Sequence, residues 1–161
     1  MLVILQTIKR CNRYKLALNN GTISTMKTAQ EYLIAKGVHP SHQRVAIMDY
    51  LLKNRTHPTV ETLYEALHPT MPTLSKTTIY NTLKLLEEKG ALVSINIEEK
   101  HTRYDADTHP HAHFQCVCCH TIYDIILDKA PDLPQELESG DTATEVQLYY
   151  KGICHKCKQN Q

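Results

Sequence analysis

Histidine and cysteine residues are concentrated in one short stretch of the second half of the chain. Between His109 and Asp124 the sequence reads HPHAHFQCVCCHTIYD, which holds seven side chains that could bind a metal through nitrogen or sulfur. Two cysteines of this stretch have the CxxC spacing, and a second CxxC pair follows near the C-terminus. Two such pairs are typical of a structural zinc ion held by four thiolates. The sequence therefore predicts a Zn²⁺ site with the ligands Cys116, Cys119, Cys154 and Cys157.

Other interpretations of these cysteines are buried free thiols or a redox pair. Cys118 falls outside the CxxC register and is expected to point away from the zinc. His111 and His113 alternate in a segment with strand character, so both imidazoles are expected on the same face. That spacing would allow them to share a second, different metal ion.

Charge divides the chain into two unlike halves. The whole protein has 161 residues and a net charge of +1. Residues 1–104 carry 14 Lys and Arg against 8 Asp and Glu, a net of +6, whereas residues 105–161 carry 4 against 9, a net of −5. A basic N-terminal half indicates contact with nucleic acid, and an acidic, cysteine-rich C-terminal half indicates metal binding.

The use of cysteine points to a reducing compartment. Four of the six cysteines stand in CxxC pairs, ten histidines accompany them, and the N-terminus lacks the pattern of a signal peptide. The sequence has no run of eighteen apolar residues, so no membrane-spanning segment is predicted. We therefore expect a cytoplasmic protein that uses its cysteines for metal binding.

Periodicity predicts a series of helices after an N-terminal extension at residues 1–25, which is mobile or not native. Helices are expected from Lys27 to Lys36, from Ser41 to Asn54 and from Thr59 to before Pro69. The apolar face of the second contains Val45, Met48, Leu51 and Leu52. The fourth helix is expected to begin at the N-cap Ser75 and to end at Gly90.

The fourth helix has two distinct faces. Ile79, Leu83 and Leu86 form its apolar face. The opposite face offers groups suited to phosphates, adenine edges and thymine methyls in a DNA major groove, namely Lys76, Thr77, Tyr80, Asn81 and Lys84. A β-hairpin is predicted next, from Ala91 to Asp105 with its turn at 98–100. Helices followed by a hairpin predict a winged helix-turn-helix. The plain alternative is a solvated amphipathic helix in a small α/β domain.

With these elements in this order, the chain resembles the ferric uptake regulator (Fur) family of metal-dependent bacterial repressors. The resemblance covers residues 30–157 and rests on HPT at 57–59, on SKTTIYNTL at 75–83, on RYD at 103–105, and on the HxH and CxxC motifs. It implies an α+β fold, with a winged-helix DNA-binding domain at 26–105 and a metal-binding α/β dimerisation domain at 106–161. It also implies a homodimer that binds a palindromic operator.

The resemblance further implies a regulatory site for Fe²⁺ or Mn²⁺ with the ligands His57, Asp105, His111, His113 and Asp124. Aspartate at position 124, where iron sensors usually have glutamate, is similar to the peroxide-sensing PerR branch. Pro110, Ala112 and Val146 stand where iron sensors often have further ligands, and none of them binds metal. In the peroxide-sensing branch, oxidation of His57 or His111 would remove a ligand and release the DNA.

Several other functions remain open at this point. An iron sensor or a zinc sensor would use almost the same residues. A zinc hydrolase is a different class, but the sequence places no evident catalytic carboxylate beside the histidines and lacks the HxE…PCxxC deaminase signature. A zinc-ribbon interaction protein would account for the cysteines, but not for the basic N-terminal half. The sequence therefore favours a regulator over an enzyme.

Overall fold

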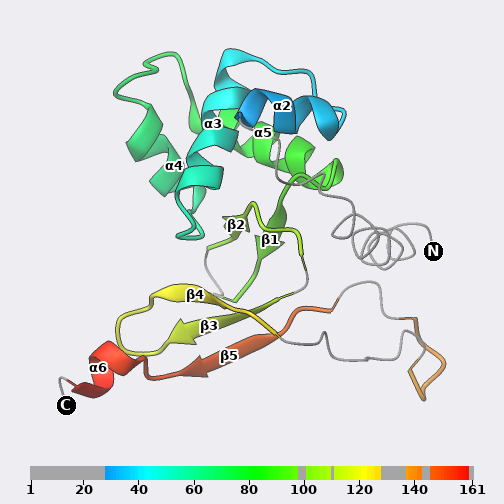
Figure 1. Ribbon diagram of the computed structural model, residues 1–161, viewed down its shortest axis with the longest axis vertical. Coiled ribbons are helices and arrows are strands. Elements are labelled where there is room, and N and C mark those ends of the chain that lie inside the picture. The colour runs from blue at the N-terminus through cyan, green and yellow to red at the C-terminus, as the bar shows by residue number, and fades with distance from the viewer. Residues whose placement is uncertain (1–27, 98–100, 110, 128–136, 143–145, 160–161) are drawn as a thin grey trace. The chain divides into compact units, whose positions relative to one another are not determined.

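The computed structural model describes residues 28–97, 101–109, 111–127, 137–142 and 146–159. The chain divides into two compact units, one of residues 26–108 and one that includes residues 109–161 (Figure 1). We call them the helical unit and the sheet unit and describe each by itself. The predicted extension at 1–25, the hairpin turn at 98–100 and Pro110 lie outside the described residues.

Four helices lie in the described part of the helical unit, and each begins at a residue with a hydroxyl side chain. They are α2 (Ala29–Ala35), α3 (His42–Lys53), α4 (Val60–Leu67) and α5 (Lys76–Glu88), with the N-caps Thr28, Ser41, Thr59 and Ser75. Each cap oxygen accepts a hydrogen bond from the amide three residues on, which satisfies a backbone donor that the helix leaves open. The predicted starts of α3 and α5 are confirmed. The first helix begins later than predicted because Thr28 and Glu31 form a capping box.

Glycine ends two of these helices. Gly37 follows α2 with φ of 70°, and Gly90 follows α5 with φ of 61°, a backbone conformation that costs glycine little. In both places the next amide, of Val38 or Ala91, donates to a carbonyl five residues earlier, which is the Schellman arrangement. The predicted stops at Gly37 and Gly90 are therefore confirmed.

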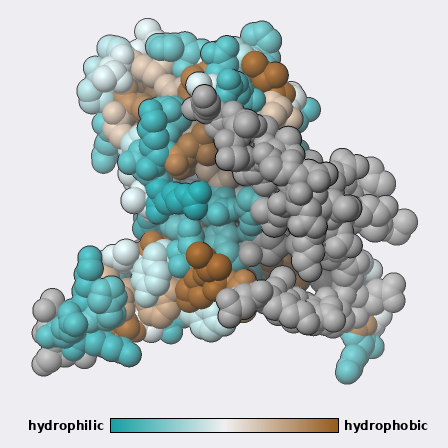
Figure 2. All heavy atoms as spheres, in the orientation of Figure 1, coloured by the Kyte–Doolittle hydropathy of each residue, from teal (hydrophilic) through white to brown (hydrophobic). Residues whose placement is uncertain are grey.

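The core of the helical unit is built from the inner faces of all four helices. Its fully buried side chains include Leu33, Ile47, Met48, Leu63, Leu74, Ile79, Leu83, Leu86 and Leu92. The face predicted for α3 was partly wrong, because Ile47 is buried while Leu52 is 39% exposed. Apolar residues occupy much of the circumference of α3, so periodicity alone does not fix which of them face the core. Hydrophilic side chains cover much of the visible surface of this unit (Figure 2).

A short antiparallel hairpin completes the helical unit. Strand β1 (Val93–Ile95) pairs with β2 (Arg103–Asp105), and Val93 lies opposite Asp105. Both strands of the hairpin predicted after the fourth helix are therefore present. Its second strand ends at Asp105, one of the predicted metal ligands.

In the part of the sheet unit that the structure describes, a three-stranded sheet is followed by one short helix. Strand β3 (Ala112–Cys116) lies in the centre, antiparallel to β4 (Ile122–Ile125) and parallel to β5 (Tyr149–Gly152). Helix α6 (His155–Gln159) follows β5 after two residues. Most of the described helices lie in one unit and the larger sheet in the other, as in the predicted α+β class. Of the helices that the structure describes, none has the length and apolar character to span a membrane.

Candidate metal centres and DNA-binding surface

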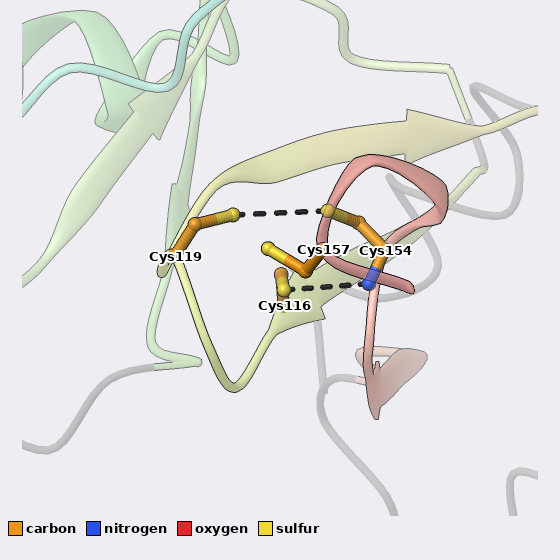
Figure 3. Close-up of side chains that lie close together, drawn as sticks. All are labelled: Cys116, Cys119, Cys154 and Cys157. Atoms are coloured by element: carbon orange, nitrogen blue, oxygen red, sulfur yellow. Dashed lines mark hydrogen bonds between the residues drawn. The ribbon is translucent and has the colours of Figure 1, made fainter. Parts of the chain in front are cut away.

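The parallel pairing of β3 with β5 brings the two CxxC pairs together. Cys116 ends β3 opposite Gly152 of β5, and the amide of Val117 donates to the carbonyl of Gly152 at 2.8 Å. The four sulfur atoms of Cys116, Cys119, Cys154 and Cys157 all lie within 4.8 Å of one another (Figure 3).

This spacing matches a tetrahedral zinc site. A tetrahedron with Zn–S bonds of about 2.3 Å has edges of about 3.8 Å, and the Sγ atoms of Cys119 and Cys154 are 3.8 Å apart. In Figure 3 the four side chains converge from the β3–β4 turn and from the start of α6. Four cysteines from two distant segments thus present their sulfur atoms at the separation that one zinc ion requires.

Backbone amides favour the thiolate form at the centre of this cluster. Hydrogen bonds from the amides of Cys119 and Cys154 lower the pKa of Cys116 to about 5. The Cys154 amide lies 3.3 Å from its Sγ atom. The pKa of Cys157 is raised, because its thiol shares hydrogen bonds with the side chains of Cys154 and Cys119. Metal binding to four thiolates must displace the remaining thiol protons.

Cys118 lies beside the cluster but outside the four cysteines whose sulfur atoms converge. Its side chain is exposed, while its amide donates to the Sγ atom of Cys116 at 3.4 Å. The exposure of Cys118 agrees with the expectation that it is not a zinc ligand, although its thiol also shares a side-chain hydrogen bond with Cys116. Desolvation, the charge of Cys116 and this hydrogen bond raise the pKa of Cys118. Thr121 is a neighbour that the sequence analysis missed, since its hydroxyl lies 3.3 Å from the Cys119 Sγ atom and lowers the pKa of that thiol.

Three of the predicted regulatory ligands converge in the sheet unit. His113 lies directly opposite Asp124 in the β3–β4 pair, and His111 immediately precedes β3. The Nε2 atoms of the two histidines are 2.9 Å apart, and the Asp124 Oδ1 atom is 3.5 Å from His111 Nε2 and 3.8 Å from His113 Nε2. The predicted alternation of the HxH motif therefore does bring both imidazoles to one place.

The backbone orients one of these imidazoles. The Nδ1 atom of His111 lies 2.7 Å from the carbonyl oxygen of His109. A carbonyl only accepts hydrogen bonds, so Nδ1 carries the proton and Nε2 of the neutral ring keeps its lone pair. That lone pair points toward His113 and Asp124, as a metal ligand requires. The role of His109 was missed, and its position two residues before His111 is the only signal for it in the sequence.

The other two predicted regulatory ligands form a pair inside the helical unit. His57 is 1% exposed and Asp105 is 4% exposed, and the Nε2 atom of His57 lies 3.8 Å from the Oδ2 atom of Asp105. The second carboxylate oxygen accepts a hydrogen bond from the amide of Asp107 at 2.8 Å. Water is largely excluded from this imidazole and carboxylate, which makes the pair a candidate half of a metal site.

The hairpin holds His57 in place. Arg103 donates from Nη1 to the carbonyl of His57 at 3.1 Å, and the Tyr104 amide donates to the carbonyl of Pro58 at 3.1 Å. His57 has φ of 51°, a conformation that costs a residue with a side chain of order 1–3 kcal/mol. Such strain persists only where surrounding contacts enforce it, and it is concentrated at functional sites.

Helix α5 presents the residues predicted to contact DNA. Lys76, Thr77, Tyr80, Asn81 and Lys84 are all exposed, while Ile79, Leu83 and Leu86 are fully buried. Lys76 is not isolated: its Nζ atom lies 3.6 Å from Glu61 and 5.6 Å from the ring centre of Tyr64. Local sequence patterns do not predict such a contact between α4 and α5.

Comparison with known proteins places these features in a family. The model of the ferric uptake regulator family matches residues 35–151. The peroxide-responsive repressor PerR of Staphylococcus epidermidis is 35% identical over 127 residues, which cover 76% of this chain and 83% of that protein. A Staphylococcus aureus protein of the same name is 34% identical over 126 residues.

Solved structures agree with this assignment at the level of the fold. The Helicobacter pylori ferric uptake regulator Fur aligns with a TM-score of 0.62 at 17% identity, over 83% of this chain and 95% of that one. The Campylobacter jejuni peroxide stress regulator aligns with a TM-score of 0.57 at 24% identity, over 80% and 95%. From the family match and the curated relatives, the chain belongs to the ferric uptake regulator family.

Proposed function

We propose that this protein is a metal-dependent, DNA-binding transcriptional repressor that responds to peroxide. The observation that carries the proposal is the similarity over three quarters of the chain to proteins named peroxide-responsive repressor PerR. The convergence of imidazoles and carboxylates within each unit supports it, because these are ligands that Fe²⁺, Mn²⁺ and Zn²⁺ accept. On this proposal the protein acts in the cytoplasm, where its operator DNA lies. It is a regulator and not an enzyme.

The four cysteines would hold a structural Zn²⁺. They supply the closed set of four sulfur ligands that structural zinc prefers, at a fitting separation. The ion would join the end of β3 to the start of α6, two segments that are separated by 34 residues between Cys119 and Cys154. It would thereby hold the sheet unit together.

A second ion would take ligands from both units. We propose that His57 and Asp105 of the helical unit and His111, His113 and Asp124 of the sheet unit bind one Fe²⁺ or Mn²⁺ ion. Such an ion binds only the arrangement in which all five ligands can reach it, so it favours that arrangement by its differential affinity. Metal occupancy would thus be linked to the arrangement that binds DNA.

The histidines would make this linkage sensitive to peroxide. A bound Fe²⁺ ion would supply the electron that reduces hydrogen peroxide, whereas Mn²⁺ would resist this reaction. His57 and His111 would then each be able to gain an oxygen atom and cease to act as ligands. The contact of the His111 Nδ1 atom with the His109 carbonyl supports this assignment because it holds that imidazole in one orientation. At His57 the bond from Arg103 holds the backbone carbonyl.

The helical unit would supply the DNA contacts. We propose that its helices and hairpin act as a winged helix-turn-helix, with α5 in the major groove and Lys76, Thr77, Tyr80, Asn81 and Lys84 toward the DNA. Two such units in a homodimer would bind a palindromic operator, since a two-fold protein matches a two-fold site.

The experiment compares metals before and after oxidation. The protein is loaded anaerobically with Fe²⁺ or Mn²⁺, and its binding to a duplex selected from a random pool is measured before and after micromolar peroxide. We expect both forms to bind and only the Fe²⁺ form to release the duplex, with a gain of 16 Da on a peptide that contains His57 or His111. Binding that follows free Fe²⁺ or Zn²⁺ and ignores peroxide would make the protein an iron or zinc sensor. Disulfide formation with unmodified histidines would assign the sensing to the cysteines.

A further inference from the structure

A polar hollow lies on the helical unit where the N-terminal end of α3 meets α5. Its volume is about 210 Å³, and it is lined by Ser41, Gln43, Arg44, Thr78, Asn81 and Thr82. All of these side chains are polar, and Arg44 is the charged one among them. Asn81 belongs to the exposed face of α5, so the hollow opens beside the surface that we propose for DNA.

Local contacts fix Arg44 in this hollow. Its Nη1 atom donates to the carbonyl of His39 at 3.0 Å, and its backbone amide donates to the Ser41 side chain at 3.3 Å. Part of the guanidinium group is thus tied to the turn before α3, which reduces the entropy cost when the group binds a ligand. The first turn of α3 contains no acidic residue, in contrast to Glu31 of α2 and Glu61 of α4.

We propose that the hollow receives a phosphate group of the DNA backbone, with Arg44 as its cation and Gln43 as a neutral hydrogen-bond donor. This inference rests on the proposed DNA binding and extends it to residues outside the recognition helix. In a helix-turn-helix the helix before the recognition helix crosses the sugar-phosphate backbone, and the N-terminal end of α3 borders the same hollow as α5. A phosphate held between α3 and α5 would fix the position of α5 along the duplex without reading its sequence.

The test removes the charge of Arg44 and compares the effect on DNA binding with that of removing the charge of a lysine on the same helix. Arg44→Gln is paired with Lys53→Gln, because Lys53 lies at the other end of α3 and bonds to Asp49 at 2.7 Å. Binding of the Mn²⁺-loaded, full-length protein to the selected duplex and to a random-sequence duplex is measured between about 50 and 200 mM salt. Arg44→Gln should weaken both by a similar factor and reduce the slope of log affinity against log salt by about 0.9 for each phosphate that is no longer neutralised. Lys53→Gln should leave the slope unchanged.

A second variant separates phosphate binding from folding. Gln43→Glu puts a carboxylate into the hollow and into the first turn of α3, where a negative charge favours the helix. We expect its melting temperature to be equal to or above that of the wild type, while its affinity for both duplexes falls. A wild-type salt slope for Arg44→Gln, or wild-type affinity for Gln43→Glu, would overturn the proposal.

The same measurements keep this inference distinct from the proposed function. If metal loading never changes the affinity but Arg44→Gln still flattens the slope on random-sequence DNA, the regulatory function fails and the phosphate site stands. If affinity depends on metal and peroxide while the slope of Arg44→Gln is that of the wild type, the phosphate site fails and the regulatory function stands.

Discussion

Cys118 and Cys119 are adjacent in the sequence, yet we expect opposite results when each is changed to serine. Cys119 presents its sulfur atom to the other three cysteines of the cluster, 3.8 Å from that of Cys154, whereas the Cys118 side chain is exposed. Cys119→Ser removes one of four thiolates from the proposed zinc site. Cys118→Ser also replaces a sulfur atom by oxygen, but in the adjacent residue, and it keeps the backbone amide that donates to Cys116.

The size of the effect follows from the small core of the sheet unit. Among the residues of this unit that the structure describes, Ile122 is the one large aliphatic side chain that is buried, and Ala112, Cys116 and Cys154 are its other buried apolar residues. One buried aliphatic side chain contributes about 1.5–3 kcal/mol. A structural zinc ion contributes about 10 kcal/mol or more in small domains. Loss of the ion therefore exceeds what this core supplies, and the sheet unit should unfold.

The assay measures zinc content, size and thermal unfolding of the two variants beside the wild type. We expect Cys118→Ser to retain one zinc per chain and the size of the wild type, and Cys119→Ser to lose zinc and run as monomer or aggregate. A zinc-free Cys119→Ser protein that remains folded and dimeric would refute the reasoning. Loss of zinc from Cys118→Ser would show that the ligand set is wrong.

Three further predictions concern the helical unit and the regulatory ligands. Leu83→Ala should lower the free energy of unfolding by about 2–5 kcal/mol because the side chain is fully buried. Lys84→Ala should change the free energy of unfolding by less than about 0.5 kcal/mol but weaken DNA binding. Urea unfolding and DNA titration of both variants check this. Asp124→Glu should keep metal-dependent DNA binding but reduce histidine oxidation by peroxide, as measured by peptide mass, since the longer side chain alters the ligand geometry; wild-type oxidation would contradict it. Arg103→Ala removes the hydrogen bond to the His57 carbonyl. Loss of a hydrogen bond that supports a metal ligand typically weakens metal binding roughly 10-fold to 100-fold, and we expect a decrease of this size for Mn²⁺. An unchanged Mn²⁺ affinity in isothermal titration would exclude this role.

The elements that were predicted well are those whose signals are local. Ser41 and Ser75 begin helices because a hydroxyl and an amide three residues on satisfy each other, and both members of that contact lie within four residues. The CxxC and HxH motifs are equally local, and each pair does converge. Position within these motifs was therefore enough to find the four cysteines and the two histidines, whereas His57, Asp105 and Asp124 were proposed from the family resemblance.

Features that depend on distant segments were not predictable in the same way. The parallel pairing of β5 with β3 joins residues that are 36 apart, His113 and Tyr149, and the short strand YYKG has no alternation that reveals its partner. The buried face of α3 was misjudged between Ile47 and Leu52 because the choice depends on which helices cover α3. The contact between Lys76 and Glu61 likewise joins two helices across a turn.

Contacts inside the helical unit give a physical route from the proposed metal ligand to the proposed DNA surface. The carbonyl of His57 is held by Arg103, and the carbonyl of Pro58 is held by the amide of Tyr104. Tyr104 also lines a hollow shared with Lys76 and Tyr80 of α5. Because these two bonds join the backbone of His57 and Pro58 to β2, a shift of the strained backbone at His57 would act on β2, whose Tyr104 lines the hollow beside α5. The hairpin would thus combine two tasks, since the strand that carries the proposed ligand Asp105 also borders residues of α5 that we propose for DNA contact.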